Sequence, residues 1–500
     1  MARSGPLPAA HEPQLRYGTG QARWVLGATV LGSGIVFLDG TVVQVAVPAI
    51  GDDLGTSLSG LQWTVNAYLV TLSALLLLGG NLGDRFGRRR MFVVGLAGFT
   101  FASLLCGLAP SAGFLILARA LQGVGGALLV PGSLSIIAAT FHPDDRPKAI
   151  GAWSGLAGVA SAAGPFLGGW LIDSISWRLL FLVNVPLAAV AIWITVRHVP
   201  ESHDEAQTRL DLPGAALAAM ALASITYAAI EQDGALRPIA AVVGAAAAVA
   251  FVIVERRSQH PMLQLDLFAS RQFTGANLST VAVYAGLGGA FFLVVLRLQF
   301  SLGYSALAAG AALVPFTALL LVVAPGAGQL SQRIGARAPM TVGPIIAAGG
   351  MVLLSRISPG DHYASGVLPG VVIFGLGISL TGAPLTAAVF ASVDDDRAGV
   401  ASGINNAAAR VAGLLAVAAL PALSGIPTDG ALASGLGSGF ATGMRISAAI
   451  TALGGIIAFA AIRGTARVSS VHQPSVLHPC HDPGIRQRPH REAVATGAAS

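Results

Sequence analysis

The chain has 500 residues, of which 54% are hydrophobic and only 10% are charged, and its formal net charge is +6 at pH 7. An average soluble domain carries about 25% charged residues, so this composition indicates an integral membrane protein. The positive charge does not indicate a nucleic-acid-binding protein, because the arginines are spread over short segments between apolar runs and form no basic face.

The N-terminal segment, residues 1–24, is polar and contains several prolines, so we expect a disordered tail. Apolar runs long enough to cross a bilayer, which takes about 20 residues, recur after it. We predict about fourteen spans, near residues 25–48, 61–80, 91–109, 114–139, 148–171, 178–197, 212–230, 237–255, 274–296, 306–326, 339–355, 365–388, 398–421 and 442–463. An even number of spans places both chain ends on the same side of the membrane.

The first span contains Asp39, the one acidic residue that we place deep in the membrane. A carboxylate there costs about 3 kcal/mol on insertion scales, and such residues are by default functional candidates such as proton carriers. The alternative is a structural ion pair with an arginine. Arg119 in the fourth span is an available partner, because the helical rise places the two residues at ~21 Å and ~8 Å from opposite faces of a core about 30 Å thick.

A charged segment, Gly80–Arg90, separates the second and third spans. Its four arginines predict that this loop and both termini are cytoplasmic, because Lys and Arg are retained on that side. Gly83 and Gly87 would allow the chain to reverse sharply. Asp84 could face the start of the next helix or pair with an arginine such as Arg88. An ordinary positive-inside loop would explain the arginines but not the placed glycines and the aspartate.

The fifth span carries a cluster of glycines around a proline, namely Gly164, Pro165, Gly168 and Gly169. Proline removes one backbone donor, and glycine permits close contact between helices. We therefore predict a kinked, tightly packed helix, with a generic glycine-rich interface as the alternative.

Internal repetition organises the chain into two halves. The segment Gly328–Arg337 repeats Gly80–Arg90 after the tenth span, with Gln332 in the place of Asp84. Spans seven and eight have no counterpart in either half, so we read them as an insertion. The predicted organisation is an N-terminal tail, a six-helix bundle, a linker with two extra transmembrane helices, a second six-helix bundle and a disordered cytoplasmic tail, over 1–24, 25–200, 201–265, 266–463 and 464–500.

Two cysteines and two histidines raise no expectation of a metal site. Cys106 lies in an apolar run, and the spacing of His478, Cys480 and His481 in the C-terminal tail fits no standard zinc pattern.

Several motifs together resemble the fourteen-helix drug:proton antiporters of the EmrB/QacA type, within the major facilitator superfamily. They are Leu38-Asp39-Gly40-Thr41-Val42-Val43, Val47-Pro48, Trp63, Tyr68, the arginine and glycines that begin at Arg119, Gly164-Pro165-x-x-Gly168-Gly169, Trp177-Arg178 and Asn184-Val185-Pro186. The segment Gly80–Arg90 likewise resembles the signature loop between helices 2 and 3 of that superfamily. The likeness extends from about residue 34 to 463.

The resemblance implies roles for individual residues. Asp39 and Arg119 would serve proton coupling, and the fifth-span motif would mark an exporter. The cytoplasmic gate would comprise Gly80, Gly83, Asp84, Arg85, Gly87 and Arg88. The sequence departs from the family pattern at Gln44, Ala160 and Arg297. Spans 10 and 13 lack the acidic residues that some relatives use for cationic drugs, which argues against dicationic substrates.

We expect a proton-driven exporter of amphipathic organic compounds or drugs, working by alternating access in the inner membrane of a bacterium, with a monomer as one option for its assembly. It would use the proton gradient and no cofactor. Polar residues that could line the substrate site are Gln44, Asn66, Gln122, Asn405 and Asn406. The alternatives are a dedicated exporter of one metabolite or antibiotic and, more remotely, a membrane sensor. An enzyme is not expected, because the spans offer no cluster of catalytic side chains.

Overall fold

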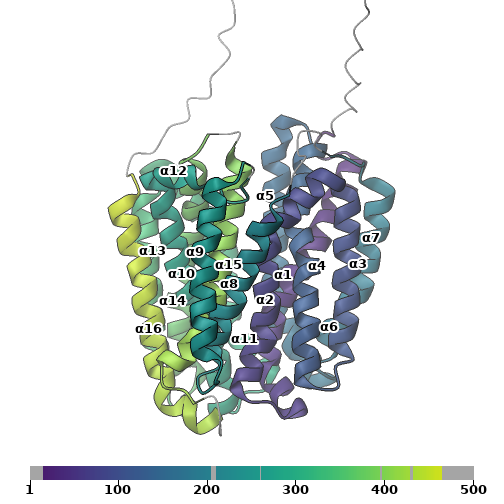
Figure 1. Ribbon diagram of the computed structural model, residues 1–500. Coiled ribbons are helices and arrows are strands. Elements are labelled where there is room, and N and C mark those ends of the chain that lie inside the picture. Colours follow the sequence, from purple (N-terminus) through teal and green to yellow (C-terminus); the bar gives the residue numbers. More distant parts are fainter. Residues whose placement is uncertain (1–14, 204–209, 260, 395–396, 428–431, 464–500) are drawn as a thin grey trace, which may run out of the picture. The chain divides into compact units, whose positions relative to one another are not determined.

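The computed structural model describes residues 15–203, 210–259, 261–394, 397–427 and 432–463. These residues form helices that run side by side (Figure 1), and fourteen of the helices are long and apolar enough to cross a membrane. The predicted all-α membrane fold is confirmed. The tail from residue 467 onward is a separate unit that lies outside the described residues, and His478, Cys480 and His481 lie there too.

The first bundle consists of α1 (Gly20–Leu54), α2 (Leu58–Phe86), α3 (Arg88–Gly107), α4 (Ala112–Thr140), α5 (Arg146–Ser174), α6 (Leu179–Leu182) and α7 (Asn184–His198). Within it, α4 packs against α2 and α3, and α1 packs against α5. Small residues allow the close approach: a Cβ atom at Gly79 would lie 2.2 Å from the carbonyl oxygen of Ala127.

The second bundle consists of α10 (Arg271–Leu296), α11 (Ala306–Ala312), α12 (Val314–Ile334), α13 (Arg337–Leu354), α14 (Leu368–Phe390), α15 (Ala398–Leu423) and α16 (Leu432–Ala461). Within it, α13 packs closely against α14, where a Cβ atom at Gly377 would lie 2.2 Å from the backbone nitrogen of Ala347. Both bundles therefore use glycine to bring helix backbones together in the absence of a hydrophobic driving force between helices.

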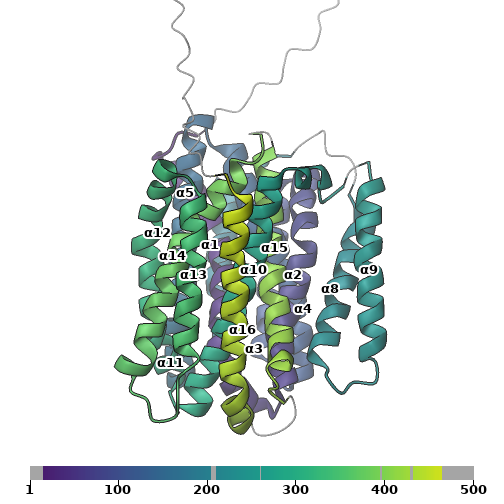
Figure 2. The same ribbon diagram turned by 90° about the vertical axis from the view of Figure 1, so that its left-hand side faces the viewer.

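The inserted pair consists of α8 (Leu212–Ile230) and α9 (Arg237–Arg257). Figure 2 shows it at the edge of the helix array, and α8 packs against α2 of the first bundle and α15 of the second. The Trp63 Nε1 donates a hydrogen bond of 2.9 Å to the Glu231 Oε1 at the end of α8. The pair therefore lies across the seam between the bundles.

The described chain starts and finishes at the same end of the helix array, where α1 begins and α16 ends (Figure 1); we call this the terminal end and the other the opposite end. At this end α1 begins at Gly20, within the segment 1–24 that we predicted to be a disordered tail. The Thr19 side chain caps α1 by accepting from the backbone nitrogen of Ala22, so the helix starts at Gly20. Leu15 is also anchored, because its nitrogen donates to the Thr140 oxygen over 2.9 Å.

The predicted loop over Gly80–Arg90 is wrong in extent, because helix occupies all of it except one residue. α2 continues to Phe86 and α3 starts at Arg88, and the chain reverses at Gly87, whose φ of 105° favours glycine. Gly83, which we also expected to shape the turn, is a buried residue within α2. Gly335, with a φ of 85°, begins the corresponding turn between α12 and α13, at the place that the sequence repeat predicts, and this turn also includes Ala336.

Candidate functional site

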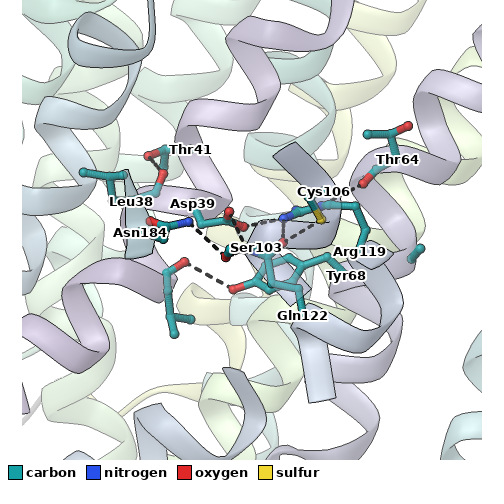
Figure 3. Close-up of polar contacts among 12 residues, drawn as sticks. Leu38, Asp39, Thr41, Thr64, Tyr68, Ser103, Cys106, Arg119, Gln122 and Asn184 are labelled. Atoms are coloured by element: carbon teal, nitrogen blue, oxygen red, sulfur yellow. Dashed lines mark hydrogen bonds and ion pairs between the residues drawn. The ribbon is translucent and has the colours of Figure 1, made fainter. Parts of the chain in front are cut away.

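A buried ion pair joins Asp39 and Arg119, the two residues that the sequence places at matching depths in the membrane. The Arg119 Nη1 on α4 lies 2.5 Å from the Asp39 Oδ2 on α1, and each side chain is only 1% exposed (Figure 3). A paired intramembrane carboxylate and guanidinium satisfy each other where neither could remain alone without a large desolvation penalty.

Three further polar side chains surround the ion pair (Figure 3). The Gln122 Oε1 accepts from the Arg119 Nη1 over 2.6 Å, and the Gln122 Nε2 donates to the Asp39 Oδ1 over 2.9 Å. The same amide nitrogen donates to the Ser103 Oγ, which also accepts from Asn184. Gln122 is fully buried in this network, so it does not line a substrate site in this conformation, contrary to our expectation.

The aromatic ring of Tyr68 lies beneath the guanidinium of Arg119. The Arg119 Cζ is 4.3 Å from the Tyr68 ring centroid and 5.6 Å from that of Phe181. The Arg119 Nε also donates to the Thr64 carbonyl oxygen over 3.1 Å. These contacts with Thr64 and Tyr68 of α2 do not involve Asp39. Protonation of the Asp39 carboxylate would therefore leave Arg119 bound to α2.

Pro165 lies inside α5, where its lack of an N–H leaves the Ser161 carbonyl oxygen without its usual helical donor. The Thr41 Oγ1 of α1 lies 3.1 Å from this oxygen and can donate its one proton either to it or to the Leu38 carbonyl oxygen of its own helix, 3.0 Å away. Gly164 permits the approach, because a Cβ atom there would lie 2.2 Å from the Thr41 Oγ1. Gly168 similarly packs against Val42. Gly164 and Gly168 therefore pack against the residues that follow Asp39, whereas Gly169 packs against Leu307 of α11, where a Cβ atom would lie 2.5 Å from the Leu307 Cα.

The predicted gate residues lie within the first bundle. The Arg88 Nε and the Asp84 Oδ1 are 2.8 Å apart, which is one of the pairings that the sequence left open. The start of α3 is instead capped by Glu201, which sequence reasoning missed: its Oε1 accepts from the backbone nitrogen of Arg89 over 3.0 Å. Among the described residues, no hydrogen bond or ion pair joins Asp84 or these arginines to the second bundle.

The remaining candidate lining residues have different surroundings. Gln44 is half-buried, Asn405 donates to Thr280 over 2.7 Å and to Asn277, and Asn406 is exposed. Asn66 is fully buried, and neither polar atom of its side chain has a hydrogen-bond partner. Gln44, Asn405 and Asn406 thus remain accessible, whereas Asn66 does not.

Arg410 is a second arginine midway along a membrane helix, and sequence reasoning missed it. It lies on α15, and its Cζ is 5.6 Å from the Phe37 ring centroid on α1. Three residues further along α15, Gly413 packs against the Tyr284 carbonyl oxygen of α10. The sequence does contain a signal for this residue, because Arg410 is the single charged residue within the apolar run 398–421.

Contacts between the two bundles concentrate at the opposite end. The Asp173 carboxylate at the end of α5 accepts from the backbone nitrogens of Ala306 and Leu307, over 3.1 and 2.8 Å. The Gln62 Nε2 donates to the Val417 oxygen over 2.7 Å, and the Gln299 Nε2 donates to the Val45 oxygen over 3.0 Å. In the described part of the chain, every hydrogen bond between the bundles lies in this half.

Metal binding has no candidate among the residues that the structure describes, because no group of three or more His, Cys, Asp or Glu side chains is placed to hold an ion.

Curated relatives include drug-resistance and export proteins. The multidrug resistance protein Stp of Mycobacterium tuberculosis is 36% identical, covering 79% of this chain and 74% of the relative. The puromycin resistance protein pur8 of Streptomyces alboniger is 39% identical, with 80% and 81% covered. The cephamycin export protein CmcT of Amycolatopsis lactamdurans is 35% identical, with 81% and 86% covered.

Solved structures show the same fold. A bacterial homolog of the human lysosomal transporter Spinster, in an inward-facing and unoccupied conformation, has a TM-score of 0.65 at 18% identity, covering 89% of this chain and 97% of that one. The xylose transporter XylE from E. coli, in an inward-open conformation, has a TM-score of 0.62 at 16% identity, with 89% and 98% covered. A family profile matches residues 29–417. The chain is a multi-pass membrane protein and belongs to the Major Facilitator Superfamily, among its drug and antibiotic exporters.

Proposed function

We propose that the chain exports amphipathic organic compounds in exchange for protons, with Asp39 as the proton carrier. The observation that carries this proposal is the buried Asp39–Arg119 pair, a carboxylate held inside the membrane by one arginine and one glutamine. Intramembrane carboxylates of this kind are typical of proton relays in transporters. The export direction follows from the exporters among the relatives.

Protonation of Asp39 removes the negative charge that Arg119 faces. The ion pair weakens, while Arg119 keeps its contacts with Thr64 and Tyr68 on α2. A proton therefore changes the strength of the link between α1 and the helices α2 and α4. A ligand that interacts differently with two conformations shifts their populations, and the proton would be such a ligand here.

The terminal end is proposed to face the cytoplasm, because it carries the arginines of the turn around Gly87. With the bonds between the bundles gathered at the opposite end, the described conformation would be closed to the outside. The pair formed by Asp84 and Arg88 would join the second bundle only when the terminal end closes, which would make it the cytoplasmic gate.

A dedicated exporter of one compound is the second candidate, since some relatives are named for a single antibiotic, among them puromycin, tetracenomycin C and cephamycin. The relative Stp is named for multidrug resistance. Export assays with a broad compound panel separate the two functions.

The test is efflux from proteoliposomes with an imposed pH gradient, using fluorescent amphipathic compounds with cationic, neutral and anionic members. Asp39→Asn keeps the shape of the protonated carboxyl but cannot release a proton, so gradient-driven efflux should fall to the level of empty liposomes. Asp52→Asn is the matched control, because Asp52 is exposed near the end of the same helix. Unchanged gradient-driven efflux in Asp39→Asn would refute the proposed role.

A further inference from the structure

We propose that Arg410 binds an anionic group, a carboxylate or a similar oxyanion, of the compounds that the protein transports. This inference rests on the proposed function and names the substrate class for it. It begins with an imbalance of charge. The helices of the second bundle, α10 to α16, contain no aspartate or glutamate, and the deep acid of the first bundle, Asp39, is already paired with Arg119. Arg410 is therefore a positive charge without a carboxylate to balance it.

The guanidinium of Arg410 makes no hydrogen bond and no ion pair with any described residue, and its Cζ lies 5.6 Å from the centroid of the Phe37 ring. Structural arginines inside membranes usually pair with acids or with backbone carbonyls, because an unpaired charge there is strongly disfavoured. The buried Arg119 follows that rule, with Asp39, Gln122 and the Thr64 carbonyl as partners. Arg410 retains all of its donors for a ligand.

The position of Arg410 fits a site between the bundles. It stands midway along α15, ~18 Å from the start of that helix at 1.5 Å per residue, so lipid headgroups at the membrane surface do not reach it. α15 belongs to the second bundle, whereas Phe37 belongs to α1 of the first. Arg410 is only half-buried, so part of its surface is accessible here.

The neighbouring side chains suit an aromatic or amphipathic anion. Tyr284 of α10 is 37% exposed, and its carbonyl oxygen would lie 3.8 Å from a Cβ atom at Gly413, three residues beyond Arg410 on α15. The ring of Phe37 is held edge-on by Trp153, with ring centroids 6.3 Å apart. A guanidinium offers five donors in a planar fork that matches a carboxylate, and aromatic rings bind the apolar remainder of such a molecule. The site thus combines one charged anchor with apolar walls.

Binding to the purified full-length protein in detergent tests the inference without a pH gradient. The probes are benzoate, 2-naphthoate and anthracene-9-carboxylate, each compared with its neutral carboxamide by equilibrium dialysis. We expect at least one carboxylate to bind the unchanged protein about tenfold more tightly than its amide, because a charge-assisted bidentate contact is stronger than a neutral one. Arg410→Gln should remove this preference while changing amide binding less than about twofold, and Arg410→Lys should keep part of it.

Arg356→Gln is the matched control, because it removes the same charge from an exposed turn at the opposite end and should leave the preference intact. Absence of any carboxylate preference in the unchanged protein, or its persistence in Arg410→Gln, would overturn the inference. These outcomes are separate from those of the efflux assay. Gradient-driven efflux without a carboxylate preference would support proton-driven export and reject the anionic substrate class. A carboxylate preference without gradient-driven efflux would support anion binding at Arg410 and reject proton-driven export.

Discussion

Two arginines of the first bundle, one at its centre and one at its end, differ in how their charges are paired. Arg119 is enclosed by partners on three helices, whereas Arg178 at the opposite end pairs with Asp53 over 2.6 Å at a site where both side chains are about one-third to one-half exposed. Buried and exposed pairs of the same chemistry respond differently to the loss of one member, because only the buried partner is left without water.

Arg119→Ala should therefore destabilise the protein by about 3–5 kcal/mol, since it leaves the Asp39 carboxylate buried and uncompensated. Arg178→Ala, the same change in an exposed pair, should cost less than about 1 kcal/mol. The measurement is unfolding of the purified protein by SDS. Adding Asp39→Asn to Arg119→Ala should recover much of the lost stability by removing the unpaired charge. A double variant as unstable as Arg119→Ala alone would contradict this account.

The sequence could identify these residues but not all of their partners. A charge, a proline or a glycine within an apolar run is visible without a structure, which is why Asp39, Arg119 and Pro165 were predicted. Arg410 is equally visible in the sequence, as a single charge within the apolar run 398–421, and was not predicted. The role of Glu201 could not be predicted, since it caps a helix that begins more than 100 residues earlier in the chain.

At the scale of helices, α1 and α5 are joined by a hydrogen bond that the sequence does not predict. The Thr41 hydroxyl can donate to the Ser161 carbonyl oxygen that Pro165 leaves free. In a membrane, backbone groups freed by proline must be satisfied from within the protein, and Ser or Thr side chains commonly do this. The glycine–proline motif and the Thr41 that follows Asp39 are therefore two parts of one contact.

Thr41→Val should destabilise the protein by about 1–3 kcal/mol, because the Ser161 oxygen loses its donor. In a Pro165→Ala background the same change should have little effect, since the restored backbone N–H of residue 165 then donates to Ser161 in the ordinary helical manner. SDS unfolding of the four proteins gives the coupling between the two sites. Thr386→Val is the matched control, because its hydroxyl bonds only within its own exposed helix face. Equal effects of Thr41→Val in both backgrounds would show that Thr41 does not replace the missing donor.

At the scale of the whole molecule, the two bundles are tied by side chains that bond to backbone atoms of the other bundle. Asp173 accepts from two backbone nitrogens, and Gln62 and Gln299 donate to carbonyl oxygens. Exchange to a state open at the opposite end must break these bonds and move the bundles apart. The strongest of the ties should be Asp173, because its charged carboxylate lies at the start of α11, where a helix favours an anion.

Asp173→Ala should therefore shift the population toward the state open at the opposite end. Loss of a helix-capping carboxylate costs about 1–2 kcal/mol, which corresponds to a roughly 5- to 30-fold change in the ratio of the two states. Spin labels at Asp52→Cys and Arg356→Cys report the separation, because both positions are exposed at the opposite end, one on each bundle. Double electron–electron resonance should show a longer distance gaining weight in Asp173→Ala. Asp173→Asn keeps an oxygen acceptor for the same nitrogens and should shift the distribution less. An unchanged distance distribution in Asp173→Ala would mean that the other ties alone hold the opposite end closed.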